Sequence, residues 1–216
     1  MTHCDPYPTY SRPERIADGV MHVMGVLFAL IGSVLMIVLA TGRTEGATLA
    51  GLWVYGAAMV MSFTASACYH FTPWEGPRPW LRRVDHAAIY LKIAGTYTPL
   101  VVVIGSAFAY GVLALVWALA VIGVLAKLFF WARPTRWGAV LYVAMGWLSL
   151  TLLSSLWPVV PVSAMVLMGV GGLIYTLGAV LFSLDGLRFQ NAIWHGFVNV
   201  ASGCFFAAIA LAAFTA

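Results

Sequence analysis

Side chains that bind metals and move protons recur at helical spacing in an otherwise apolar sequence. Ser66 and His70 are four residues apart, so both can face one point inside a helix bundle, and Asn191 and His195 have the same spacing. Imidazole is a good ligand for Zn²⁺, and a carboxylate such as Asp85 can bind the ion or orient a water. The pattern therefore suits a hydrolytic zinc site in which the Ser66 hydroxyl stabilises an oxyanion or the water.

Further polar groups accompany this set. Glu14, Asp18 and His22 follow one another at intervals of four residues along one helix face. Lys92 lies seven residues after Asp85, on nearly the same face and about 10 Å further along the helix. It either pairs with a polar neighbour or snorkels, or it supplies a fixed positive charge near the site.

Each of these residues also has a purely structural interpretation. A single histidine in a helix bundle is often a core residue that hydrogen-bonds a neighbouring helix, and a serine often bonds its own helix carbonyl. His3 lies on the amino-terminal tail, and His86 points away from Asp85, so neither is expected to be a ligand. The spacing of Cys68 and Cys204 also turns them away from the histidines.

Composition decides which architecture holds these groups. Of the 216 residues, 62% are hydrophobic and 8% are charged, and the mean hydropathy is +0.95. A soluble domain carries about 25% charged residues, so both a soluble globule and a disordered chain are excluded. We predict an all-α, polytopic membrane protein. Its net charge of +4 reports orientation in the bilayer, and no nucleic-acid partner is expected.

Apolar stretches of about 20 residues, the length that crosses a bilayer, predict a seven-helix bundle. A short cytoplasmic segment, residues 1–18, precedes a membrane domain that covers residues 19–216. The predicted spans are Gly19–Ala40, Leu49–His70, Val84–Ile104, Phe108–Phe130, Trp137–Leu156, Val162–Leu184 and Ala192–Phe214.

The distribution of basic residues orients the bundle. With a cytoplasmic amino terminus, only Arg43 falls on the outer face, which predicts an N-in, C-out membrane protein. The inner face then receives Arg12, Arg15, Arg78, Arg82, Arg83, Arg133, Arg136 and Arg188. This orientation brings the polar groups of four spans into the inner leaflet, where ionisable residues mark functional sites.

At these residues the sequence resembles the bacterial hemolysin III family, the prokaryotic branch of the progestin and adipoQ receptors. The resemblance covers nearly the whole chain. Its motifs are Glu14-Arg-Ile-Ala-Asp-Gly-Val-Met-His22, Ser66-Ala-Cys-Tyr-His70, Asp85-His-Ala-Ala-Ile-Tyr90, Ile93-Ala-Gly-Thr-Tyr-Thr-Pro99 and Ala192-Ile-Trp-His195-Gly-Phe-Val.

The family is similar to a wider group of membrane hydrolases that includes alkaline ceramidases. That similarity implies zinc held by His70, by His195 and by a third histidine at position 191, with Asp85 holding the water. This chain has Asn191 there, and a neutral amide oxygen is a poor zinc ligand beside imidazole. Asn191 is therefore expected to be a weak or lost ligand, which leaves zinc occupancy open.

Three functions remain as alternatives. The first is a metal-dependent hydrolase of a lipid amide or ester whose site lies in the inner leaflet. The second is a non-enzymatic regulator or sensor of membrane lipid or energy state, with a structural polar cluster. The third is a cytolytic pore, which has little support because no span carries a continuous polar stripe. Membrane lipids are the expected partners in each case.

Overall fold

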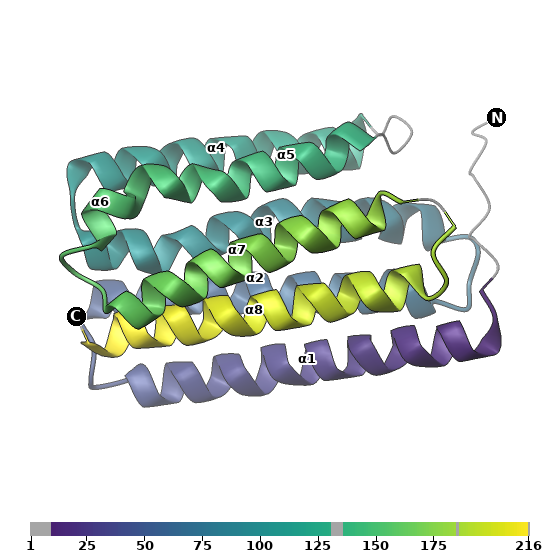
Figure 1. The fold of residues 1–216 in the computed structure, drawn as a ribbon, viewed down its shortest axis with the longest axis horizontal. Coiled ribbons are helices and arrows are strands. Elements are labelled where there is room, and N and C mark those ends of the chain that lie inside the picture. Colours follow the sequence, from purple (N-terminus) through teal and green to yellow (C-terminus); the bar gives the residue numbers. More distant parts are fainter. Residues whose placement is uncertain (1–9, 131–135, 185, 216) are drawn as a thin grey trace.

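The computed structural model describes residues 10–130, 136–184 and 186–215, and these form a bundle of helices without strands. His3 and Arg133 lie outside the described residues. Six helices are long and apolar enough to cross a membrane, and a shorter apolar helical stretch, Val140–Leu156, accompanies them. The all-α, polytopic membrane fold is thereby confirmed (Figure 1).

Four of the long helices contain the apolar stretches predicted from the sequence, whereas the fourth and the sixth predicted spans end one and two residues beyond their helices. Their bounds are α1 (Arg12–Ala40), α2 (Gly46–Phe71), α3 (Arg78–Ile104), α4 (Ala107–Phe129), α7 (Val162–Phe182) and α8 (Gln190–Thr215).

Helix α1 begins at Arg12 instead of at the first apolar residue because polar groups cap it there. The backbone N–H and the hydroxyl of Ser11 both donate to Oε2 of Glu14, at 2.9 and 2.6 Å, and Pro13 lies in the first turn, where its missing N–H costs nothing. The extra turns place Asp18 inside the helix, one turn before His22.

The fifth apolar stretch does not form one continuous α-helix. It consists of α5 (Arg136–Trp147), the 3₁₀ segment η1 (Leu148–Leu152) and the short α6 (Leu153–Leu156). The Tyr97 hydroxyl of α3 lies 2.9 Å from the carbonyl oxygen of Met145 and 2.8 Å from that of Gly146, so its one proton can be donated to either carbonyl. A carbonyl that accepts from another helix is less available to its own, and the ladder tightens into 3₁₀ geometry just after this point.

Helix α3 lies at the centre of the packing, in contact with α2, α4, α5 and α8, while α1 packs against α2 and α8. Its approach to α2 is close because Gly95 has no side chain: a Cβ there would lie 2.6 Å from the Cβ of Ala58. At the end of the bundle where α1 begins, the end of α2 and the starts of α3 and α8 lie close together.

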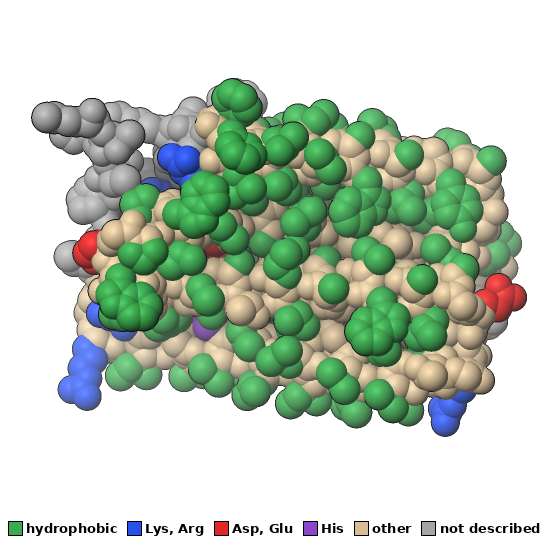
Figure 2. All heavy atoms as spheres, turned by 180° about the vertical axis from the view of Figure 1, so that it is seen from behind, with side chains coloured by type: hydrophobic (Ala, Val, Ile, Leu, Met, Phe, Trp, Pro, Cys, Tyr) green, Lys and Arg blue, Asp and Glu red, His purple; other side chains and the backbone are tan. Residues whose placement is uncertain are grey.

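The outer surface of the bundle is apolar. Large side chains such as Val23, Ile31, Val38 and Ile122 are more than half exposed, as the side chains of a lipid-facing surface are. In Figure 2, hydrophobic side chains cover the flank that is drawn, while charged side chains gather towards the two ends. The exposed apolar area therefore has its explanation in the bilayer.

Candidate metal centre

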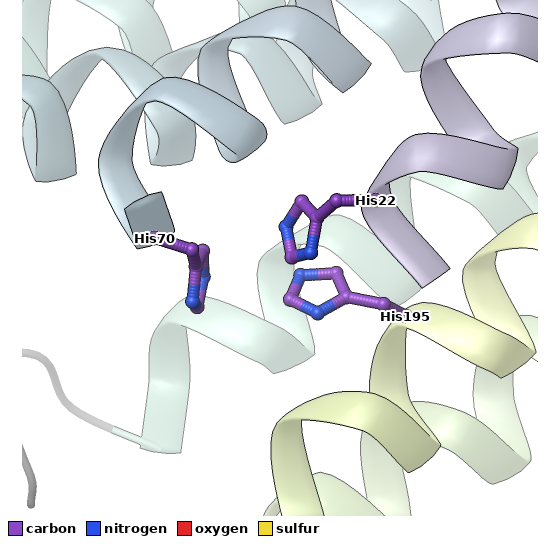
Figure 3. A group of neighbouring side chains, drawn as sticks. All are labelled: His22, His70 and His195. Atoms are coloured by element: carbon purple, nitrogen blue, oxygen red, sulfur yellow. The ribbon is translucent and has the colours of Figure 1, made fainter. Parts of the chain in front are cut away.

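Three histidines from three helices meet at the amino-terminal end of the bundle. His22 comes from α1, His70 from the last turn of α2 and His195 from the second turn of α8 (Figure 3). Their ring centroids are 4.0 to 4.9 Å apart, and one nitrogen from each ring lies within 4.8 Å of the others. Only 4 to 10% of each side chain is exposed, so the three imidazoles form a compact, buried group that can bind a metal.

Hydrogen bonds define the tautomers of two of these rings. His22 Nδ1 lies 2.9 Å from the carbonyl oxygen of Asp18, and His195 Nδ1 lies 2.7 Å from Oδ1 of Asp18. Both partners only accept hydrogen bonds when the carboxylate is ionised, so each Nδ1 carries the proton. The Nε2 atom of each neutral ring is then left with a free lone pair.

Ser66 lies where these two lone pairs converge. Its Oγ is 3.3 Å from Nε2 of His22 and 3.3 Å from Nε2 of His195. A hydroxyl has one proton, so it can satisfy only one of the two nitrogens. The excess of lone pairs over protons is the condition that a cation relieves, and three imidazole nitrogens are a donor set that Zn²⁺ prefers. The residues present therefore fit a metal ion.

Two carboxylates flank the imidazoles. Asp18, which is 6% exposed, contacts them on their Nδ1 side. Asp85 contacts Ser66 and lies within electrostatic range of His195, and its Oδ2 is 3.8 Å from Nδ1 of His86. The arrangement places one acid behind the rings and another beside the Ser66 hydroxyl.

Asn191 lies beside the three histidines at the mouth of the site. Its Nδ2 is 3.5 Å from Nδ1 of His70, and it also hydrogen-bonds the Tyr10 phenol, whose pKa burial raises above its ordinary value. The third imidazole at the centre is supplied by His22 of α1. Asn191 contacts His70 and Tyr10, and it is not a member of the group of three residues that could bind a metal.

Two other residues of the polar set have separate roles. Glu14 caps α1 and accepts the backbone N–H of Phe189, at 3.1 Å, which ties the segment before α8 to α1. Lys92 lies deeper in the bundle, where its ammonium donates to Ser202 Oγ at 2.8 Å and lies over the ring of Phe63. The polar-neighbour interpretation of Lys92 thus matches its contacts.

The residues that sequence reasoning set aside lie apart from the centre. Nδ1 of His86 is 2.8 Å from the carbonyl oxygen of Arg82, Cys68 is exposed, and Cys204 is partly buried on α8. The feature that sequence reasoning underestimated is Asp18, whose carboxylate contacts all three histidines. Its spacing of four residues from His22 was the available signal.

A small pocket leads from the surface to this group. It is lined by Asp18, His70 and Asn191 at its inner end, and by Tyr10, Glu14, Arg15, Phe71, Phe189 and Ala192 towards the surface. The pocket lies between α1, the end of α2 and the start of α8. The pocket therefore reaches His70 and Asp18 from the surface.

Comparison with known proteins identifies the family. The model of the haemolysin-III-related family matches residues 11–206, and the chain belongs to that family. The chain is 31% identical to Hemolysin-3 of Bacillus cereus over 89% of both proteins, and 29% identical to the Hemolysin-3 homolog of Bacillus subtilis over 89% of this chain and 91% of that one. It is also 28% identical to the human monocyte to macrophage differentiation factor, over 91% of this chain and 83% of that protein.

Proposed function

We propose that this chain is a metal-dependent hydrolase of a lipid amide or ester, with its site in the inner leaflet of a bacterial inner membrane. The observation that carries the proposal is the convergence of two bare Nε2 atoms on a single hydroxyl, with a third imidazole beside them. A buried group of three histidines with an adjacent acid and hydroxyl is unusual for a site that only stabilises a fold.

His22, His70 and His195 would hold the ion, and zinc is the metal that the donor set favours. When bound, Zn²⁺ would polarise a substrate carbonyl group and would lower the pKa of a bound water to near neutral pH. The protein's own residues perform the remaining tasks. Asp85, beside Ser66, is placed to take the proton of the attacking water and to return it to the leaving amine or alcohol.

Ser66 has a second task in this proposal. Its hydroxyl points at the centre of the imidazoles, where the oxygen of a substrate carbonyl would become negatively charged during attack. A fixed donor at that place stabilises the developing charge more than the ground state. The apolar walls of the bundle would hold the lipid chain, and the pocket beside Asn191 would hold the polar end.

The experiment uses the full chain, purified in detergent and returned to lipid nanodiscs. Metal content is measured by mass spectrometry, and lipid amides and esters are then incubated with the protein and analysed for released fatty acid. We expect about one zinc per chain, release of fatty acid that chelator stops, and loss of both in His195→Ala. The matched control for metal content is His86→Ala, a change of a histidine at the same end but outside the metal group, and the control for release of fatty acid is Glu75→Gln, a change of an exposed acid that pairs with Arg78.

Other outcomes of this experiment would favour the regulator or sensor, or the pore. Bound metal without release of fatty acid from any lipid class would overturn the hydrolase and support the non-enzymatic regulator or sensor. The absence of metal from the protein would overturn the metal centre itself. Conductance in planar bilayers at the same protein density would support the pore, the activity that the name Hemolysin-3 of the Bacillus cereus relative suggests.

A further inference from the structure

Asp18 has contacts that a merely structural acid would not need. Its Oδ1 lies 2.7 Å from Nδ1 of His195 and 3.4 Å from Nδ1 of His22, and its Oδ2 lies 3.5 Å from Nδ1 of His70. One carboxylate therefore reaches the same ring atom in all three imidazoles. No other described carboxylate contacts more than one of them.

The backbone of the same residue adds a further contact. The carbonyl oxygen of Asp18 lies 2.9 Å from Nδ1 of His22, which follows one turn later on α1. Asp18 thus fixes the Nδ1–H tautomer of His22 through its main chain and that of His195 through its side chain. Both rings then present Nε2 to the point that Ser66 occupies.

Charge balance indicates the same role. A divalent ion held only by neutral imidazoles would bring two uncompensated positive charges into a buried site, which is costly in a membrane. Asp18 on the Nδ1 side and Asp85 on the Ser66 side are the two carboxyl groups that could compensate this charge without binding the ion directly.

We propose that Asp18 is the shared positioning residue of the metal centre: it orients the imidazoles for a divalent cation from behind and is not a ligand. The proposal rests on the metal centre proposed above. Metal-binding histidines usually donate their second nitrogen to a carboxylate or carbonyl, and loss of that partner typically weakens metal binding by 10- to 100-fold. Asp18 performs this task for more than one ring, which gives it an effect on the whole ligand set.

The test measures metal affinity and coordination in the purified full chain, independently of any turnover. Asp18→Asn keeps an oxygen that can accept from His195 but removes the charge, while Asp18→Leu removes both at similar volume. Glu75→Gln is the control, because it removes a negative charge from an exposed acid at the same end of the bundle that pairs with Arg78 and contacts no histidine. Zinc affinity is obtained by competition with a chromogenic chelator, and the ligand set from the visible spectrum of the Co²⁺ form.

We expect Asp18→Asn to lower zinc affinity by about 10-fold, Asp18→Leu by about 100-fold, and Glu75→Gln by less than twofold. The Co²⁺ spectrum of Asp18→Asn should keep the band pattern of the original protein, because the three nitrogen ligands remain. Thermal midpoints of the metal-free variants separate weaker binding from poorer folding.

Two results would overturn the inference while leaving the metal centre in place. Unchanged zinc affinity in both Asp18 variants would show that the rings need no orientation from this acid. A changed Co²⁺ band pattern in Asp18→Asn would show that Asp18 is itself a ligand. If the original chain binds neither ion, the metal centre and the inference fail together, which distinguishes this case from the first two.

Discussion

At the scale of the residue, the proposed metal centre depends on His22, which brings an imidazole from α1 to a group of histidines that otherwise comes from α2 and α8. Its ring centroid lies 4.0 Å from that of His195 and 4.9 Å from that of His70, so it occupies a position that neither can replace. Catalytic zinc sites usually have three protein ligands and leave the fourth coordination position for water or substrate. Without His22, only two imidazoles would remain to bind the ion.

His22→Ala should therefore lower the zinc affinity of the purified chain by at least tenfold, which corresponds to about 1.4 kcal/mol of binding free energy. The measurement is chelator competition on the full chain. His86→Ala should bind zinc as the original protein does, because Nδ1 of His86 bonds the Arg82 carbonyl, away from the centre. Equal affinities for the two variants would show that α1 contributes no ligand.

A histidine at position 191 could replace the imidazole that His22→Ala removes. Asn191 lies one turn before His195 on the same face of α8, and its amide is 3.5 Å from Nδ1 of His70. Asn191→His in the His22→Ala background should therefore recover most of the lost zinc affinity, since an imidazole replaces a weak amide ligand beside two remaining imidazoles. If the double variant binds as weakly as His22→Ala, position 191 cannot reach the ion.

A substitution of Asp85 should lower turnover without lowering zinc binding. Asp85→Asn keeps the size of the side chain but removes the base, so zinc content should persist while release of fatty acid falls by 10²- to 10⁴-fold, the usual contribution of general acid–base catalysis. Turnover and metal content are measured on the same preparation. Equal turnover in Asp85→Asn and in the original chain would remove this carboxylate from the proposed reaction.

The grouping of the site could be predicted from the sequence more readily than the role of each member. Spacing and orientation bring His22, His70, Asp85 and His195 to one end of the bundle, and the structure places them there. The part played by Asp18 could be predicted only in part, because its spacing puts it on the same face as His22 while its distances to His70 and His195 depend on how far α1 is rotated against α2 and α8. Hydrogen bonds between helices set that rotation, and the periodicity of a single helix carries no information about them.

At the scale of the element, α2 and α3 approach each other closely at Gly95 and Ala58. A second substitution at Ala58 can test this contact. Gly95→Ala would place a Cβ 2.6 Å from that of Ala58, nearer than two such atoms can approach. The helices would have to separate, and overpacking of this kind costs about 1–3 kcal/mol. The thermal midpoint in detergent should fall, and Ala58→Gly should restore most of it in the double variant. Additive destabilisation by the two changes would contradict the clash.

Helices could be predicted from the sequence where most of their side chains face lipid, because such helices are apolar along their whole length. Long apolar stretches give α4 and α7, whose side chains face outward over most of their length. The break between α5 and α6 could not be predicted, because its cause is the Tyr97 hydroxyl of another helix. The start of α1 before Gly19 was expected from the helical spacing of Glu14, Asp18 and His22, and Ser11 and Glu14 form a capping box at its first turn.

At the scale of the whole molecule, the proposed function depends on an asymmetry between the two ends of the bundle. The histidines, both flanking acids and the pocket lie at the end where α1, α3 and α8 begin. The opposite end holds the turns at Gly42 and Gly105, both of which adopt the left-handed backbone conformation that glycine permits. The orientation of the bundle therefore decides which side of the membrane the three histidines face.

Basic residues predict that this end faces the cytoplasm, because Arg12, Arg15, Arg78, Arg82 and Arg188 all flank it, whereas Arg43 flanks the other end. Reporter fusions test the prediction at two loops. A fusion at Gly76, between α2 and α3, should be active only as a cytoplasmic reporter, and one at Gly42, between α1 and α2, only as an external reporter. The reverse pattern would place the histidines at the outer leaflet and assign the proposed hydrolase to external lipids.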